Sequence, residues 1–116
     1  MDKLSIGKAG EEEALRYYLQ RGYRLRDRNW RYLKAEVDLI VENDDWLVFV
    51  EVKSRANDAY GEGQEFVSRA QQKRLIKAAN AYVEQKDLYK EIRFDIIAIL
   101  REPKFQLSHF EEAFHP

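Results

Sequence analysis

Cysteine is absent from the sequence, which excludes disulfide bonds, thiolate metal sites and cysteine nucleophiles. Only two histidines occur, His109 and His115, so a histidine-rich zinc site is not expected. No apolar run approaches the roughly 20 residues that a membrane-spanning helix needs, and the N-terminus lacks the pattern of a secretory signal. We therefore expect a cytoplasmic protein that makes no contact with a membrane.

An excess of charge of one sign is also missing, because the formal net charge is only −1. Many nucleic-acid-binding domains are clearly basic, so this balance argues against extended, non-specific binding to phosphates. A local basic patch remains compatible with it. The length of 116 residues suits a single domain spanning 1–116, and 45% hydrophobic with 35% charged residues is an ordinary globular composition.

Hydrophobic periodicity predicts the order helix, three strands, helix, two strands. Glu11, Ala14, Leu15 and Tyr18 fall on one stripe of a helix over 6–21, which Gly22 ends. The other predicted elements are a strand over 23–29, two strands within 35–55, a loop over 54–66, a helix over 68–85, and strands over 92–100 and 105–110. This order indicates an α/β fold.

The stretch 35–55 has acidic residues in otherwise apolar strands. Alternation along the first strand is expected to put Glu36 and Asp38 on one face, with Val37, Leu39 and Val41 on the other. The polar turn over 42–45 is rich in residues that tolerate hairpin geometry.

On the second strand of this stretch, Glu51 and Lys53 share a face with Leu47 and Phe49. Folding the two strands against each other would bring Asp38, Glu51 and Lys53 together at one end of a sheet. Carboxylates on largely buried strands are costly unless they pair with a cation or hold a metal ion. The stretch is therefore the expected functional site.

Two carboxylates are a suitable ligand set for Mg²⁺, which takes few protein ligands and retains several waters. A lysine beside them could orient or deprotonate an attacking water, or stabilise a charged transition state. Spacing alone also fits a simple cross-strand salt bridge between Lys53 and an acid, which would contribute little.

Asp38 followed by Glu51-Val52-Lys53 resembles the PD-(D/E)XK motif of the restriction-endonuclease-like superfamily. Most of the chain also resembles the YraN family of small bacterial proteins. The matching pieces are Gly7, Gly10-Glu11, Ala14, Gly22-Tyr23, Asn29, Glu36-Val37-Asp38-Leu39-Ile40, Phe49-Val50-Glu51-Val52-Lys53-Ser54-Arg55, Tyr60-Gly61, Lys73 and Arg93-Phe94-Asp95. The resemblance implies an αβββαβ core, in which helices flank a central mixed sheet.

The resemblance also implies roles for individual residues. Asp38 and Glu51 would bind Mg²⁺ or Mn²⁺ with help from Glu11, Lys53 would be the catalytic lysine, and Glu36 would support the site. From the residues alone, Glu11 is equally well explained as a first-turn acid that the helix dipole favours. Two positions depart from the usual pattern: Ala35 replaces a glycine of the family, and Val37 replaces the superfamily proline.

Arg55 directly follows the strand that carries Glu51, so it is expected to contact phosphate. Arg69, Lys73 and Lys77 form a basic row on the second helix, which fits either phosphate positioning or a solvated face. Gln72 lies on the predicted inner stripe of that helix, where it would assist the site or cap a buried polar group. Aromatic candidates for stacking on bases are Trp30, Tyr32 and Tyr60, although aromatic residues at strand ends more often pack in the core or its rim.

The expected function is that of a Mg²⁺-dependent endonuclease acting on DNA, with branched or damaged DNA as the substrate. The alternative is a module of the same fold that binds nucleic acid or a protein partner without turnover. A glycosidase with a carboxylate pair fits poorly, because the chain is short and a lysine adjoins the acid. A domain that resolves a two-fold DNA junction would favour a symmetric homodimer.

Overall fold

The computed structural model describes residues 2–57 and 67–116. In these residues the elements follow the predicted order. They are α1 (Lys3–Gln20), β1 (Arg24–Tyr32), β2 (Ala35–Glu42), β3 (Trp46–Arg55), α2 (Arg69–Lys86), β4 (Glu91–Leu100) and β5 (Gln106–Phe114). The largest differences from the prediction are at β1 and β5, which both extend farther along the chain, and at the expected loop, since β3 continues to Arg55. Tyr60 and the two glycines that favoured the expected loop, Gly61 and Gly63, lie outside the described residues.

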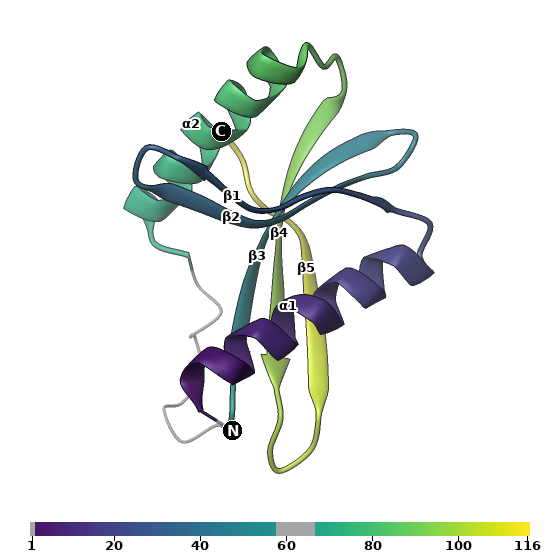
Figure 1. Cartoon of the computed structure of the whole chain (residues 1–116), viewed down its shortest axis with the longest axis vertical. Coiled ribbons are helices and arrows are strands. Elements are labelled where there is room, and N and C mark those ends of the chain that lie inside the picture. Colours follow the sequence, from purple (N-terminus) through teal and green to yellow (C-terminus); the bar gives the residue numbers. More distant parts are fainter. Residues whose placement is uncertain (1, 58–66) are drawn as a thin grey trace.

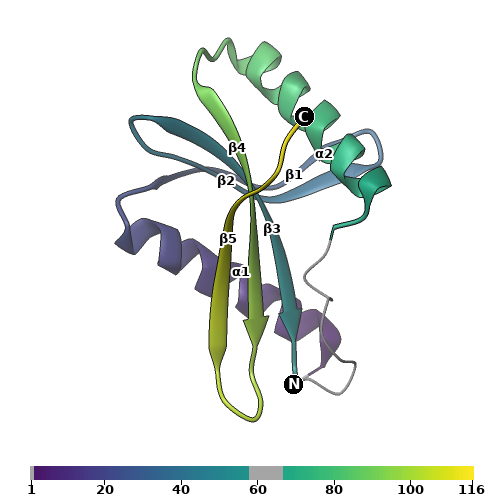
Figure 2. The same ribbon diagram turned by 180° about the vertical axis from the view of Figure 1, so that it is seen from behind.

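The strands form one mixed sheet in the order β1-β2-β3-β4-β5. All neighbouring strands are antiparallel except β3 and β4, which are parallel and are connected through α2. Helix α1 covers the face seen in Figure 1, and α2 covers the opposite face, which is seen in Figure 2. Within the described residues, no helix is long and apolar enough to cross a membrane.

Helix α1 packs tightly on β3. Its buried residues Ala14 and Tyr18 belong to one core cluster with Val48 and Val50. Near the start of the helix, a Cβ built at Gly10 would lie 2.7 Å from Cβ of Ser54, so glycine is needed for this close approach. The predicted C-terminal stop is confirmed: Gly22 has φ 86, and the backbone N–H groups of Gly22 and Tyr23 donate to α1 carbonyls.

Helix α2 packs on the other face. Ser68 caps its N-terminus by accepting a hydrogen bond from the backbone N–H of Gln71 at 3.2 Å. Its buried residues Leu75, Ala78, Ala79 and Tyr82 form the second core cluster with sheet residues that include Leu47 and Phe49. The expected sharing of one face by Leu47 and Phe49 is therefore confirmed.

The expected alternation along β2 is wrong at Val37. Val37 belongs to the cluster on the α2 face, whereas Leu39 and Val41 belong to the cluster on the α1 face. The reason lies in the pairing of β2 with β3, which begins only at Leu39 opposite Val50. Before that point β2 pairs with β1 alone, and the β1–β2 hairpin turns away from β3 toward α2 (Figure 1). A split between β2 and β3 results.

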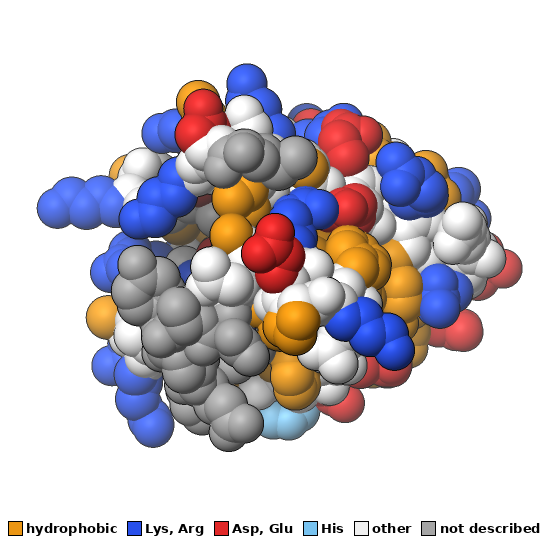
Figure 3. Space-filling view, turned by 90° about the horizontal axis from the view of Figure 1, so that it is seen from below, with side chains coloured by type: hydrophobic (Ala, Val, Ile, Leu, Met, Phe, Trp, Pro, Cys, Tyr) orange, Lys and Arg blue, Asp and Glu red, His pale blue; other side chains and the backbone are white. Residues whose placement is uncertain are grey.

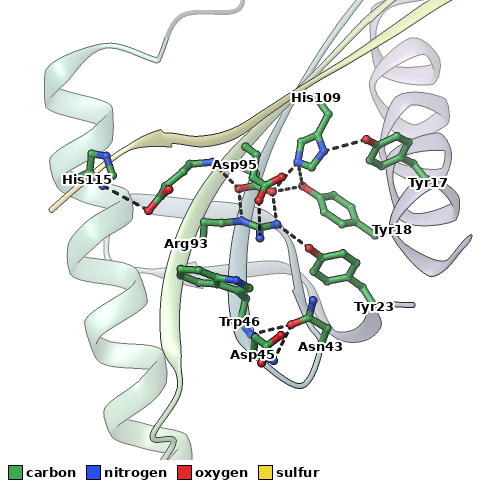
Figure 4. Close-up of polar contacts among 12 residues, drawn as sticks. Tyr17, Tyr18, Tyr23, Asn43, Asp45, Trp46, Arg93, Asp95, His109 and His115 are labelled. Carbon is green, nitrogen blue, oxygen red and sulfur yellow. Dashed lines mark hydrogen bonds and ion pairs between the residues drawn. The ribbon is translucent and has the colours of Figure 1, made fainter. Parts of the chain in front are cut away.

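A buried polar network lies under the C-terminal half of α1, which carries Tyr17 and Tyr18 (Figure 4). Asp95 of β4 is fully buried and accepts hydrogen bonds from Arg93 at 2.9 Å and from the hydroxyl of Tyr18 at 2.7 Å. His109 of β5 lies 2.7 Å from the same carboxylate and 2.9 Å from the hydroxyl of Tyr17. Residues two apart on a strand share a face, which predicts a structural pair of Arg93 and Asp95. The structure confirms this pair, and its network connects α1, β4 and β5.

Candidate metal and phosphodiester site

Asp38 lies where β2 and β3 separate. Its Oδ2 accepts a hydrogen bond of 2.8 Å from the backbone N–H of Val52, so the side chain takes the place that a strand carbonyl would occupy. Burial raises the pKa of Asp38 to about 8, and the negative charge of Glu51 adds to the effect, while the Val52 hydrogen bond opposes it. An anion in this position is unfavourable unless a cation is near.

Glu51 is 9% exposed and faces the same split from β3. Its Oε1 lies 3.5 Å from Nζ of Lys53 and accepts a hydrogen bond of 3.3 Å from Nε2 of Gln71. Burial raises the pKa of Glu51, and the positive charge of Lys53 partly offsets that effect. Both carboxyl groups therefore resist ionisation, and the ammonium group of Lys53 lies beside Glu51.

Asp38 and Glu51 line a common pocket of about 250 Å³, together with Glu36, Gln71 and other residues of the β1–β2 hairpin and α2. Within residues 2–57 and 67–116, Oδ1 of Asp38 and Oε2 of Glu51 accept no hydrogen bond. In the same residues, no group of three or more acidic or histidine side chains is arranged to hold a metal ion. The donor set fits a hard cation that binds two carboxylates and completes its shell with water, as Mg²⁺ does.

The structure therefore brings together Asp38, Glu51, Lys53 and Glu36. Glu11 approaches from α1, and its charge contributes to the raised pKa of Asp38. Its Oε1 accepts a hydrogen bond of 3.1 Å from Asn29 of β1, and Glu11 is not among the residues that line the pocket. Glu11 thus lies in the outer part of this acidic group.

Gln71, which the sequence reasoning missed, contacts the site, and Gln72 does not. The side chain of Gln72 donates to the backbone carbonyl of Val67 at 2.9 Å, which is the capping role that was one of its two expected uses. The signal that favours Gln71 is its place four residues before Leu75, on the stripe that includes Ala78 and Tyr82.

The predicted basic residues lie on β3 and α2, and none of them lines the acidic pocket. Arg55 is half-buried at the end of β3, where its carbonyl accepts from the backbone N–H of Arg101 at 3.2 Å. Arg69, Lys73 and Lys77 are exposed on α2. In the view from the end of the molecule where β3 terminates, Lys and Arg side chains project at many points around the rim, with acidic side chains between them (Figure 3).

The departure at Ala35 has no conformational cost, because Ala35 is buried in β2 and is not among the positive-φ residues. Leu33, in the preceding turn, has φ 54 instead. Trp30 and Tyr32 stack on each other with parallel rings, 6.1 Å between centroids, and both pack at the edge of the α2-side core. Tyr60 is outside the described residues.

These features define a class: an α/β protein with a restriction-endonuclease-like αβββαβ core, a mixed sheet flanked by two helices, and buried acids where two strands separate. The chain belongs to the uncharacterised protein family UPF0102, whose model matches residues 10–99. The resemblance to the YraN family that the sequence motifs indicated is thus confirmed.

Relatives of this family cover nearly the whole chain. The UPF0102 protein of Flavobacterium psychrophilum is 44% identical over 111 residues, which are 95% of this chain and 93% of the relative. The UPF0102 protein of Bacteroides thetaiotaomicron is 39% identical over 112 residues, covering 96% and 93% of the two chains. The UPF0102 protein of Rhodococcus opacus is 40% identical over 114 residues, covering 96% and 97%.

Proposed function

We propose that this protein is a Mg²⁺-dependent endonuclease that hydrolyses phosphodiester bonds of DNA. The observation that carries the proposal is the pair of buried carboxylates in one pocket, with Lys53 3.5 Å from Glu51. A structural salt bridge would need one acid for one lysine. Here a second acid, Asp38, is kept in a position where burial and Glu51 raise its pKa to about 8.

In this proposal Asp38 and Glu51 hold the ion, each through the oxygen that has no hydrogen-bond donor in the described residues. Mg²⁺ would supply positive charge that lowers the pKa of a water and neutralises charge developing on a phosphate oxygen. The hydrogen bond from Val52 fixes the orientation of Asp38, and the amide of Gln71 fixes Glu51. The side-chain conformations of both ligands are therefore fixed by hydrogen bonds from neighbouring residues.

Lys53 is the group that meets the substrate. It shares the face of Glu51, and its Nζ lies 3.5 Å from Oε1 of that acid, so a phosphate bound to the ion would come within range of its ammonium group. There it would orient the phosphate or water and stabilise negative charge in the transition state. Glu36, which also lines the pocket, would accept hydrogen bonds from the waters that complete the shell of the ion.

The test is a cleavage assay on linear, nicked, flapped and four-way DNA and on RNA, with Mg²⁺ or Mn²⁺. Asp38→Asn is preferable to alanine, because the amide oxygen can still accept from Val52 while the charge is lost. We expect Asp38→Asn and Lys53→Ala to retain the fold and to lose cleavage by at least about 100-fold. Lys104→Ala is the matched control, since Lys104 is an exposed cation outside the pocket.

Calorimetric titration with Mn²⁺ separates this proposal from a non-catalytic binding module. The proposal requires ion uptake by the wild type and its loss in Asp38→Asn. Wild-type cleavage rates in both site variants, or equal Mn²⁺ uptake by Asp38→Asn, would show that the assignment is wrong.

A further inference from the structure

A second hollow of about 410 Å³ adjoins the acidic pocket. Its lining residues are Tyr32, Leu33, Lys34, Ala35, Arg74 and Lys77. Lys34, Ala35 and Arg74 also line the acidic pocket, so the two hollows share a border that carries two cations. A ligand lying in the second hollow would therefore reach the acids by passing Lys34 and Arg74.

Leu33 makes the hollow apolar at a position where stability alone would favour another residue. It lies in the two-residue turn between β1 and β2, is 83% exposed, and has φ 54. Glycine or asparagine adopts this backbone conformation at less cost, and an exposed leucine gains nothing from burial. A partner that covers the side chain of Leu33 would supply the favourable free energy of burying its apolar surface.

Among the described residues, the cations of the hollow have no acidic partners. Within the part of the chain that the structure describes, Lys34, Arg74 and Lys77 form no ion pair. The basic residues of β1 differ: Arg28 and Arg31, for example, pair with Glu12 and Glu36. From residue 69 to residue 83, α2 contains no acidic residue. Uncompensated positive charge therefore borders the acidic pocket and complements a polyanion.

We propose that this hollow holds an unpaired nucleotide of a DNA strand, next to the phosphate that enters the acidic pocket. The base lies on the apolar side chains of Tyr32 and Leu33, and Lys34 and Arg74 contact the phosphate that joins the two hollows. A base inside a duplex must be unstacked before it can reach such a hollow. The inference rests on the proposed function, and it narrows the substrate to DNA with single-stranded character beside the cleaved bond.

Binding can be measured apart from cleavage. Fluorescence anisotropy with the full chain in EDTA compares a labelled oligothymidylate with a duplex of the same length and with the corresponding RNA. We expect the single strand to bind at least about tenfold more tightly than the duplex, as stacking of one base would allow. Lys34→Ala and Arg74→Ala are expected to weaken single-strand binding by about five- to tenfold each and to reduce its dependence on salt. Lys104→Ala should change neither quantity.

The turn offers a second pair of variants that tests the apolar part of the hollow. Asparagine and aspartate both tolerate the backbone conformation of Leu33 and differ in charge alone. We expect Leu33→Asp to weaken strand binding several-fold more than Leu33→Asn, because the new carboxylate would repel the phosphates. Circular dichroism confirms that each variant is folded.

Equal affinity for single strand and duplex, equal effects of Lys104→Ala and Arg74→Ala, or no binding at all would each overturn the inference. Tight RNA binding with no DNA binding would overturn it as well. Its failure is distinct from that of the proposed function. If cleavage depends on Asp38 but not on Arg74, the proposed endonuclease function stands and the nucleotide site is wrong. If the single strand binds through Arg74 but no DNA is cleaved, the nucleotide site stands and the proposed endonuclease function is wrong.

Discussion

Neutralising Asp38 should stabilise the protein in the absence of divalent ions. The perturbation is Asp38→Asn, which retains the acceptor for Val52 and removes the charge. In the folded protein the pKa of Asp38 is about 8, compared with an ordinary value of 3.8. The folded state thus binds a proton that the unfolded state has released at neutral pH.

The direction of the pH effect follows from this difference. A carboxyl group whose pKa is raised by folding contributes its full stability below pH 3.8 and loses it as the pH rises through about 8. Four pKa units correspond to an upper limit of about 6 kcal/mol. Because the pocket opens to solvent and Glu51 titrates together with Asp38, we expect a measured effect of about 2–3 kcal/mol.

The assay is urea unfolding of wild type and Asp38→Asn in EDTA at pH 5, 6, 7 and 8. We expect the variant to gain stability relative to wild type with each step in pH. Addition of Mg²⁺ or Mn²⁺ should then stabilise wild type alone, by about 2.7 kcal/mol at an ion concentration 100 times Kd. Calorimetric Kd values from the same protein set the ion concentration.

A result in which Asp38→Asn is no more stable than wild type at pH 8, with parallel pH curves, would refute this reasoning. It would mean that the carboxylate is already compensated within the protein. The main physical argument for a bound metal ion would then fail, because the two carboxylates would have no uncompensated negative charge for a cation to neutralise.

Two further predictions concern stability. Gly10→Ala should destabilise the protein by about 1–3 kcal/mol, because the new methyl group would collide with Ser54 of β3. In Gly7→Ala the new methyl group meets nothing within 4 Å, so this variant should stabilise α1 by up to about 1 kcal/mol. Thermal unfolding of the two variants checks both values, and equal effects would contradict the close approach of Gly10 to β3. Asp95→Asn should cost about 3–5 kcal/mol near pH 7, because buried Arg93 would lose its buried counter-charge and keep only the exposed carboxylate of Glu111. Burial acts to raise the pKa of Asp95, but the hydrogen bonds that its carboxylate accepts lower the pKa to about 2. The stability that Asp95 gives the wild type is therefore present above pH 3.8 and falls only as the pH drops toward 2. A loss of stability centred near pH 6 would contradict this account.

Much of the fold follows from local patterns. The stripe of Ala14, Leu15 and Tyr18 identifies the buried face of α1, and Gly22 ends the helix with the positive φ that glycine allows. Alternation along β3 correctly assigns Leu47 and Phe49 to one face. These features depend on neighbours within a turn or a strand, so the sequence contains the information that fixes them.

The polar network around Asp95 shows where such patterns stop. The spacing of Arg93 and Asp95 predicts their pairing, because residues two apart on a strand share a face. Nothing in the spacing indicates that Tyr18 and His109, which lie 77 and 14 residues away, complete the network. Their participation depends on how α1 and β5 dock on β4, and that docking depends on the whole core.

The candidate site is the most instructive case, because the sequence predicts its residues while the alternation rule that led to them fails inside it. Asp38 and Glu51 do share a pocket, yet Val37 does not share a face with Leu39. The strand is irregular because the Asp38 side chain, and not a strand carbonyl, accepts the Val52 N–H. A regular ladder would have left no split between β2 and β3 and hence no pocket lined by the two acids. The same residue therefore breaks the pattern and forms the pocket, so the local exception to strand geometry is itself a sign of the site.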